Sequence, residues 1–264
     1  MNTKASLLLL PGDGIGLEAA RSLTASGHKV LLHGRSQNKL DAVAAELGGE
    51  GLIETYRADL SVFSEVRGLA AAVLAGHPKL DVLINNAGVL KTPNTTTSDG
   101  LDVRFVVNTL APYLLTRLFL PALGPEARVV NVSSAAQATV DPRAMAGEIR
   151  LSDMDAYAQS KLAITMWSRE LAKEANSPMA VAVNPGSLLA SKMVKEGFGI
   201  PGSDLSIGSD ILCRAALSDE FATASGKYFD NDAGDFGPPH SDALDPAKTA
   251  AVTAQIEALV EWYA

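Results

Sequence analysis

Tyr157 and Lys161 are the two residues of this sequence best suited to acid–base chemistry. They stand four residues apart at the start of a long apolar-patterned stretch, so on a helix they share one face, one turn from each other. A phenol has an ordinary pKa of about 10, and a neighbouring ammonium lowers that pKa because it favours the phenolate. The pair is therefore typical of a site that moves a proton to or from a substrate oxygen. The same spacing also fits an unrelated surface Tyr and Lys.

Small and polar residues gather where predicted strands end. They form three groups: Asn85-Asn86-Ala87-Gly88, Ser133-Ser134 and Asn184-Pro185-Gly186-Ser187. Each group alone fits turn chemistry, because Asn, Gly, Ser and Pro are common loop residues. All of them together, each after a strand, predict a ligand crevice at the carboxyl ends of a parallel sheet.

A glycine-bearing turn follows the first apolar run. It reads Gly12-Asp13-Gly14-Ile15-Gly16, and a helix-like segment extends from it to about Ser26. Glycines let a pyrophosphate approach the backbone at a helix N-terminus, where free N–H groups and the helix dipole favour anions. A chance turn among 22 glycines is the alternative. The position between a strand and a helix favours nucleotide binding.

Short apolar runs alternate with helical patterns along the chain. The predicted strands are Ala5–Leu10, His28–His33, Leu52–Ala58, Asp81–Asn85, Ala127–Ser133, Met179–Asn184 and Gly226–Phe229. The predicted helices are Lys39–Leu47, Phe63–Leu74, Gly100–Leu120, Asp155–Glu174, Ser206–Ala216 and an amphipathic surface helix, Pro246–Ala264. The alternation predicts an α/β fold with a doubly wound parallel sheet of about seven strands, covered by helices on both faces. With no linker and no repeat, we expect one domain over residues 1–264.

Asn108 lies inside the apolar-patterned helix 100–120, where a buried amide needs partners. Pro112 follows four residues later and has no N–H to donate to the carbonyl of Asn108. We therefore expect a kink there and a carbonyl free to accept from a water. A satisfied core Asn beside a tolerated proline is the alternative.

Charge and composition exclude several classes of protein. The 264 residues are 47% hydrophobic and carry a formal net charge of −8, which argues against nucleic acid or an anionic membrane as the main partner. The single cysteine, Cys213, excludes an internal disulfide and suits a reducing compartment. No apolar run reaches about 18 residues, so we expect no membrane span and a cytoplasmic protein. The four histidines lack ligand spacing, so we expect no metal.

Together these motifs resemble the classical short-chain dehydrogenase/reductase family, over about residues 4–230. The matching positions are Asn85-Asn86-Ala87-Gly88, Asn108, Ser134, Tyr157-x-x-x-Lys161 and Pro185-Gly186. The resemblance implies a Rossmann-type fold, a nicotinamide cofactor and a catalytic tetrad of Asn108, Ser134, Tyr157 and Lys161. Residues 14–18 and the tail segment 226–245 look most like the retinol-dehydrogenase and protochlorophyllide-reductase branch.

The resemblance implies a role for each member of the tetrad. Tyr157 is the general acid in carbonyl reduction and the base in the reverse direction. Ser134, with Ser133 as its rival, donates a hydrogen bond to the substrate oxygen and stabilises the charge that develops there. Lys161 lowers the pKa of Tyr157 and holds the nicotinamide ribose. The carbonyl of Asn108 anchors a water that completes a proton relay.

The phosphate loop departs from the family pattern Thr-Gly-x-x-x-Gly-x-Gly. Counting back from the two later glycines places Leu9 at the Thr position and Leu10 at the first Gly. Taking Gly12 as that glycine leaves the loop two residues short. Pro11 also removes one amide donor near the pyrophosphate. We therefore expect weaker cofactor binding than the intact pattern would give.

The end of the second strand predicts NADP(H) in preference to NAD(H). It reads His33-Gly34-Arg35-Ser36, without an acid for the ribose 2′-OH and with an arginine able to grip a 2′-phosphate. Asp13 opposes this choice unless it turns outward or caps the next helix. Asp59-Leu60 matches the family's adenine-contacting pair. The predicted cofactor-binding residues are Gly12, Asp13, Gly14, Ile15, Gly16, Arg35, Asp59, Leu60, Asn85, Ala87, Gly88, Tyr157, Lys161, Pro185 and Gly186.

Residues 187–205 match the family's substrate loop and, with residues 135–156, would enclose the substrate. The loop's apolar side chains predict a lipophilic carbonyl or alcohol; they are Leu188, Leu189, Met193, Val194, Phe198, Ile200 and Leu205. Its glycines indicate a lid that orders on binding, with a packed core helix as the alternative.

Two functions remain open: an NAD(P)-dependent oxidoreductase, or a non-catalytic NADP-binding redox sensor on the same fold. The intact tetrad favours the enzyme, because a sensor needs no activated tyrosine. The sequence does not decide the oligomeric state, for which a homodimer or a homotetramer is possible. It also does not decide the role of the C-terminal tail, residues 231–264.

Overall fold

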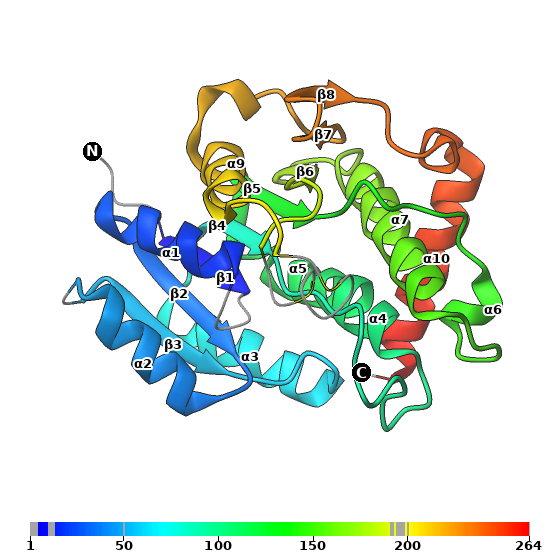
Figure 1. The fold of residues 1–264 in the computed structure, drawn as a ribbon, viewed down its shortest axis with the longest axis horizontal. Helices are drawn as coiled ribbons and strands as arrows, with labels where there is room; N and C mark the ends of the chain where they lie inside the picture. The colour runs from blue at the N-terminus through cyan, green and yellow to red at the C-terminus, as the bar shows by residue number, and fades with distance from the viewer. Residues whose placement is uncertain are drawn as a thin grey trace.

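The computed structural model describes residues 5–9, 14–49, 51–190, 193, 199 and 201–263, which form one sheet with helices on both faces (Figure 1). The strands run in the order β3-β2-β1-β4-β5-β6-β7-β8. Neighbouring strands from β3 to β7 are parallel, as predicted, and β8 is antiparallel to β7. The strands are β1 (Ala5–Leu9), β2 (Lys29–Gly34), β3 (Ile53–Arg57), β4 (Leu80–Asn85), β5 (Leu123–Val132), β6 (Met179–Asn184), β7 (Tyr228–Asp230) and β8 (Asp235–Gly237).

Helices cover both faces because the strands present apolar side chains to each side in alternation. On β2, Leu31 joins one buried cluster, whereas Val30 and Leu32 join the other. The second cluster packs under α1 (Ile15–Ala25), α2 (Gln37–Leu47) and α9 (Leu205–Leu217). The first packs under α3 (Phe63–Gly76), α4 (Val103–Phe105), η1 (Val106–Leu110), α5 (Ala111–Phe119), α7 (Asp153–Leu171) and α10 (Pro246–Tyr263). Shorter helical turns are α6 (Pro142–Met145), η2 (Asp219–Phe221) and η3 (Ser241–Leu244).

The helix predicted over residues 100–120 is three segments in the structure. It begins as α4, continues as one π-helical stretch, η1, and ends as α5. The N–H of Ala111 donates to the carbonyl of Val106, five residues back. Pro112 follows directly. The proline, which has no N–H to donate, therefore lies where the helix changes from π-type to α-type hydrogen bonds. The expected kink at the proline is therefore a π-helical insertion that spans Asn108.

Three elements differ from the sequence-based expectation. The antiparallel strand β8 was not predicted, because its three residues include no apolar run. Strand β5 begins at Leu123 rather than Ala127, with an irregular register against β4. The C-terminal helix was predicted as an amphipathic surface helix. It packs against α7, and its buried residues are Thr249, Val252, Ile256 and Val260.

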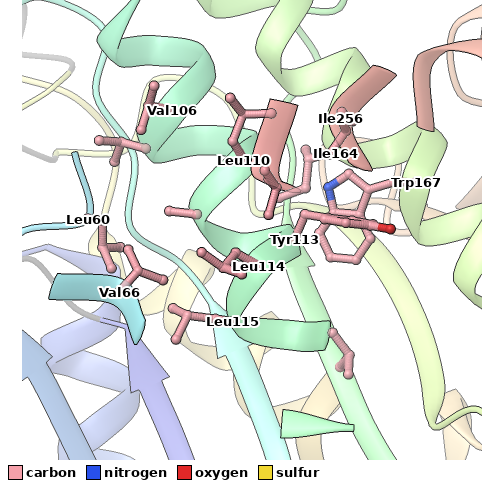
Figure 2. Close-up of a cluster of buried hydrophobic side chains, with 14 of the residues drawn as sticks. Leu60, Val66, Val106, Leu110, Tyr113, Leu114, Leu115, Ile164, Trp167 and Ile256 are labelled. Atoms are coloured by element: carbon pink, nitrogen blue, oxygen red, sulfur yellow. The ribbon is translucent and has the colours of Figure 1, made fainter. Parts of the chain in front are cut away.

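Figure 2 shows where α5, α7 and α10 meet. Tyr113, Ile164, Trp167 and Ile256 come from these three helices and point toward one another. The Tyr113 and Trp167 rings meet edge to face, with centroids 5.6 Å apart. This cluster fixes α7, the helix that carries Tyr157 and Lys161, against its neighbours on the side away from the sheet.

Candidate active site

Helix α7 presents Tyr157 and Lys161 at the carboxyl end of β5. Ser152 caps the helix: its Oγ accepts from the N–H of Asp155 at 3.1 Å and donates to the Asp155 carboxylate at 2.6 Å. Tyr157 is half-buried and Lys161 is buried. The Lys161 Nζ donates to the carbonyl of Val132, the last residue of β5, at 2.7 Å, and lies 5.7 Å from the Tyr157 ring centroid.

Burial sets the protonation of this pair. It raises the pKa of Tyr157, with the hydrogen bond from the Ser134 side chain acting in the opposite direction. It lowers the pKa of Lys161 to about 7. Burial therefore opposes the lowering of the Tyr157 pKa that was expected from Lys161, because desolvation disfavours both charged forms. The lysine in turn is able to release and regain a proton near neutral pH.

Ser133 and Ser134 have different surroundings although they are adjacent. The Ser133 hydroxyl is buried, donates to the carbonyl of Lys161 at 2.9 Å and shares a hydrogen bond with Thr165 at 2.7 Å. The Ser134 side chain is half-buried and hydrogen-bonds Tyr157. Only Ser134 of the two therefore faces the phenol, while Ser133 fastens α7 to the end of β5.

Asn108 is buried in the π-helical stretch, and its amide is fully engaged. Its Oδ1 accepts from the N–H of Val89 at 2.8 Å, and its Nδ2 donates to the carbonyl of Val89 at 3.0 Å and to Ser160 Oγ at 2.9 Å. The Ser160 hydroxyl in turn donates to the carbonyl of Tyr157 at 2.7 Å. Asn108 thus joins the loop after β4 to the helix that carries Tyr157.

Gly88 lies where these residues converge. A Cβ placed on Gly88 would stand 3.5 Å from Lys161 Nζ, 3.6 Å from Asn108 Oδ1 and 3.6 Å from Met193 Cε. All three are ordinary contact distances, so Lys161, Asn108 and Met193 pack around the backbone of Gly88.

The other strand-end residues form two groups. The amide of Asn85 is buried and donates to Asn131 Oδ1 at 2.7 Å and to Thr116 Oγ1 at 3.2 Å, so its side chain ties β4 to β5 and α5. Ala87, two residues further on, is half-buried against the first hydrophobic cluster. Beyond β6, the carbonyl of Pro185 accepts from Asn231 at 3.0 Å, and Gly186, with φ 118°, donates its N–H to Asn184 at 3.3 Å.

The hairpin between β7 and β8 holds the start of the substrate loop. Asp232 accepts from the N–H of Ser187 at 2.8 Å, from its hydroxyl at 2.5 Å and from the Asn184 amide at 2.9 Å. Further on, the N–H of Ala190 donates to the carbonyl of Ser203 at 2.7 Å. The two ends of residues 190–203 are therefore fixed together at the base of the loop. The expected apolar residues Val194, Phe198 and Ile200 lie outside the described residues.

At the phosphate end, Gly14 is the N-cap of α1 with φ 82° and ψ −158°, a conformation that only glycine adopts readily. Ile15 begins the helix and Gly16 is buried in it. Gly208 of α9 packs here so closely that a Cβ would lie 2.6 Å from Ile15 Cγ2. Gly12 and Asp13 lie outside the described residues, as do Leu10 and Pro11.

At the adenine end, Arg35 is exposed and forms no ion pair with any other described residue. Asp59 Oδ1 accepts from the N–H and hydroxyl of Ser61, at 2.9 and 2.7 Å. Leu60 is buried in the core, where Figure 2 shows it next to Val66. The exposed guanidinium is thus the group here that is free to meet an added phosphate.

Two residues that the sequence did not single out hold Ser134. The carbonyl of Ser134 accepts from Gln137 Nε2 at 2.9 Å and from the Tyr228 hydroxyl at 3.1 Å. The N–H of His240 donates to Gln137 Oε1 at 3.3 Å, so the C-terminal segment supports the same loop. Nothing in the sequence pattern indicates the Tyr228 contact, because it forms only once β7 lies beside β6.

Fold and site together define an α/β oxidoreductase that uses a dinucleotide. Residues 11–198 match the short chain dehydrogenase family. Retinol dehydrogenase 13 from Homo sapiens is 32% identical over 250 residues, which cover 82% of this chain and 73% of that protein. The chain therefore belongs to the short-chain dehydrogenase/reductase family, in its retinol-dehydrogenase-like branch, and is an NAD(P)-dependent oxidoreductase acting on alcohol or carbonyl groups.

Solved structures show the same fold. An uncharacterized protein from Mycobacterium Paratuberculosis has a TM-score of 0.82 at 29% identity, over 98% of this chain and 93% of that one. A short chain dehydrogenase from Shigella flexneri 2a str. 301, complexed with NADP, has a TM-score of 0.70 at 25% identity, over 88% of this chain and 98% of that one. Within the described part of the chain, no helix could cross a membrane and no acidic, His or Cys cluster could hold a metal.

Proposed function

We propose that this protein transfers hydride between NADP(H) and a lipophilic carbonyl or alcohol, with Tyr157 as general acid in reduction and general base in oxidation. The observation that carries the proposal is the convergence of Tyr157, Ser134, Lys161 and Asn108 beside Gly88. A phenol whose pKa burial raises keeps its proton at neutral pH, so it is in the acid form that reduction of a carbonyl needs.

The neighbouring groups support that proton transfer. Ser134 already hydrogen-bonds the phenol, so its hydroxyl is placed to donate to a substrate oxygen that binds beside Tyr157. Lys161, with a pKa of about 7, is able to pass a proton toward the phenol and regain it from solvent. Asn108 holds the helix and loop on either side of this path. The bound nicotinamide would supply or accept the hydride.

The proposed cofactor residues lie along the carboxyl ends of the strands, where a nicotinamide nucleotide would bind. Gly14 and Ile15 would receive the pyrophosphate at the N-terminus of α1, and Gly88 with Lys161 would receive the nicotinamide half. The exposed Arg35 after β2 favours NADP(H) over NAD(H). Asp59, Leu60, Asn85, Ala87, Pro185 and Gly186 complete the proposed cofactor site.

An apolar substrate is supported by the hydrophobic groups around the site. Met193 approaches Gly88, and two large apolar side chains near the loop base are exposed: Leu188 by 45% and Ile207 by 47%. Leu188 has φ 53°, a left-handed conformation that a branched side chain rarely adopts. Exposed apolar side chains of this kind favour a substrate that covers them on binding.

The test is NADPH oxidation with a panel of aromatic, aliphatic and steroid-like carbonyls, in wild type and in Tyr157→Phe. We expect turnover of bulky apolar carbonyls by wild type and a loss of at least about a thousandfold in Tyr157→Phe, since the ring stays and only the acidic proton is removed. NADPH binding, followed by nucleotide fluorescence, should be the same in both. Equal turnover would disprove the role of Tyr157, and binding without turnover in wild type would favour the redox sensor.

We further propose that the protein acts in the cytoplasm. The lone Cys213 is half-buried, and burial raises the pKa of its thiol to about 11, so it stays a thiol at neutral pH. Such a chain suits a reducing compartment. Cell fractionation, with NADPH-dependent activity followed in the soluble fraction, tests this placement.

A further inference from the structure

One buried guanidinium connects the two helical segments that carry the active site. Arg104, on α4, is 2% exposed, and Asp102, beside it, is 4% exposed. The Arg104 Nε and Nη2 donate to the two oxygens of Asp102, at 2.8 and 2.5 Å. Its Nη1 donates to Asp153, the first residue of α7. The two carboxylates lie on different segments, so this contact fastens α4 to the start of α7 (Figure 1).

The positions of these residues relate them to the site. Arg104 stands four residues before Asn108, and Asp153 stands four residues before Tyr157. Four residues make about one helical turn, so each charged group lies one turn before an active-site residue on its own segment. From this pairing we infer that Arg104 is a positioning residue, which sets the separation of Asn108 from Tyr157 and Lys161. The inference rests on the oxidoreductase function proposed above.

Further contacts repeat the same connection one turn later. Asn108 Nδ2 donates to Ser160 Oγ at 2.9 Å, and the Thr109 hydroxyl donates to the carbonyl of Ser160 at 2.8 Å. Before the helices, Gly147 packs so tightly that a Cβ would lie 2.8 Å from the carbonyl oxygen of Gly100. The neutral contacts define distances over one turn. The charged contact joins the same two segments at the first residue of α7.

Arg104 touches neither substrate nor cofactor, so it acts through the geometry of Tyr157. A displacement of about 1 Å at reacting atoms lowers turnover by up to about a hundredfold. We expect Arg104→Gln to lower kcat about 10- to 100-fold, with KM for NADPH unchanged within about twofold. Arg104→Lys should regain part of this loss, because lysine keeps the charge but cannot bridge both carboxylates as a planar fork does.

Asp153→Asn separates positioning from electrostatics. Its carboxylate is 42% exposed, so this variant is less of a threat to folding than the loss of Arg104. The two substitutions change the local charge in opposite directions. An effect of charge alone would therefore move the apparent pKa of the kcat profile in opposite directions, whereas loss of positioning lowers kcat in both. Should Arg104→Gln fail to fold, the kcat of Asp153→Asn alone tests whether the contact positions Tyr157.

Arg117→Gln is the matched control. Arg117, on α5, pairs at 2.6 Å with Glu174, three residues beyond the end of α7, and both side chains are exposed. We expect its kcat to equal that of wild type. Wild-type kcat in both Arg104→Gln and Asp153→Asn would overturn the inference while leaving the proposed function in place.

Amide hydrogen exchange gives a readout that does not depend on turnover. In the unliganded protein, Arg104→Gln should increase exchange at residues 153–161, while Arg117→Gln should leave this segment unchanged. Unchanged exchange there in Arg104→Gln would count against the inference even if no wild-type substrate were found. An inactive wild type with increased exchange in the variant would disprove the proposed function alone.

Discussion

Arg35 is the exposed cation at the end of β2, and its charge should decide the choice of cofactor. We expect Arg35→Ala to lower kcat/KM for NADPH about 10- to 100-fold, since a charge-assisted hydrogen bond to a 2′-phosphate contributes about 1.5–3 kcal/mol. The value for NADH should stay within about twofold, because NADH has no phosphate there. Steady-state kinetics with both cofactors measures the ratio.

The control for this substitution is another arginine on the neighbouring strand. Arg57 is aligned with Gly34 in the β2–β3 register, is exposed and lies 3.7 Å from Glu65. Arg57→Ala removes the same charge from the same edge of the sheet. If it lowers kcat/KM for NADPH as much as Arg35→Ala does, then the overall positive potential of this surface sets the preference for NADPH, and not a direct contact between Arg35 and the 2′-phosphate.

At the scale of single residues, the sequence indicated the candidate site residues but not the residues that hold them in place. Tyr157, Lys161 and Ser134 could be singled out because their chemistry is visible in spacing and in resemblance. Their pKa values could not, because burial depends on what covers them. Tyr228, which holds the Ser134 carbonyl, comes from a strand 94 residues away in the sequence, and no local pattern indicates that contact.

At the scale of elements, β3 is fastened to β2 and α3 by Glu54. Lys29, 2.6 Å away, holds the pKa of Glu54 down to about 2, with hydrogen bonds from His77 at 2.8 Å and Tyr56 at 2.9 Å adding to the effect and burial opposing it. A carboxyl whose folded pKa lies below its unfolded value of 4.5 stabilises the fold above that value. This contribution is then lost as the pH falls from about 4.5 to about 2.

Glu54→Gln should therefore destabilise the protein by about 1 kcal/mol at pH 7, a value reduced for the 39% exposure of the carboxylate. The difference from wild type should shrink toward zero near pH 2–3. Urea unfolding at several pH values measures it. Glu148→Gln, in an ion pair exposed by 60% or more on both sides, should differ little from wild type at any pH. A pH-independent cost at Glu54 would contradict the assignment.

Elements were predicted well where hydrophobic runs are buried on both faces. The parallel strands stand within a few residues of their predicted positions, because such strands read as continuous apolar runs. Pro112 correctly indicated an interrupted helix, but not its form, since whether a chain kinks or inserts a π-helical turn depends on packing around Asn108. Strand β8 exists only through its pairing with β7 and carries no such signal.

At the scale of the whole molecule, the C-terminal helix α10 covers one side of the first hydrophobic cluster. Ile256 is fully buried beside Ile164 and Trp167 (Figure 2), whereas Trp262, six residues later, is 82% exposed. We expect Ile256→Ala to lower the free energy of unfolding by about 2–5 kcal/mol, because it leaves a cavity against α7. Trp262→Ala should cost less than about 0.5 kcal/mol, although it removes more atoms. Denaturant unfolding of both variants compares them, and equal costs would show that α10 is a surface attachment and not part of the core that holds α7.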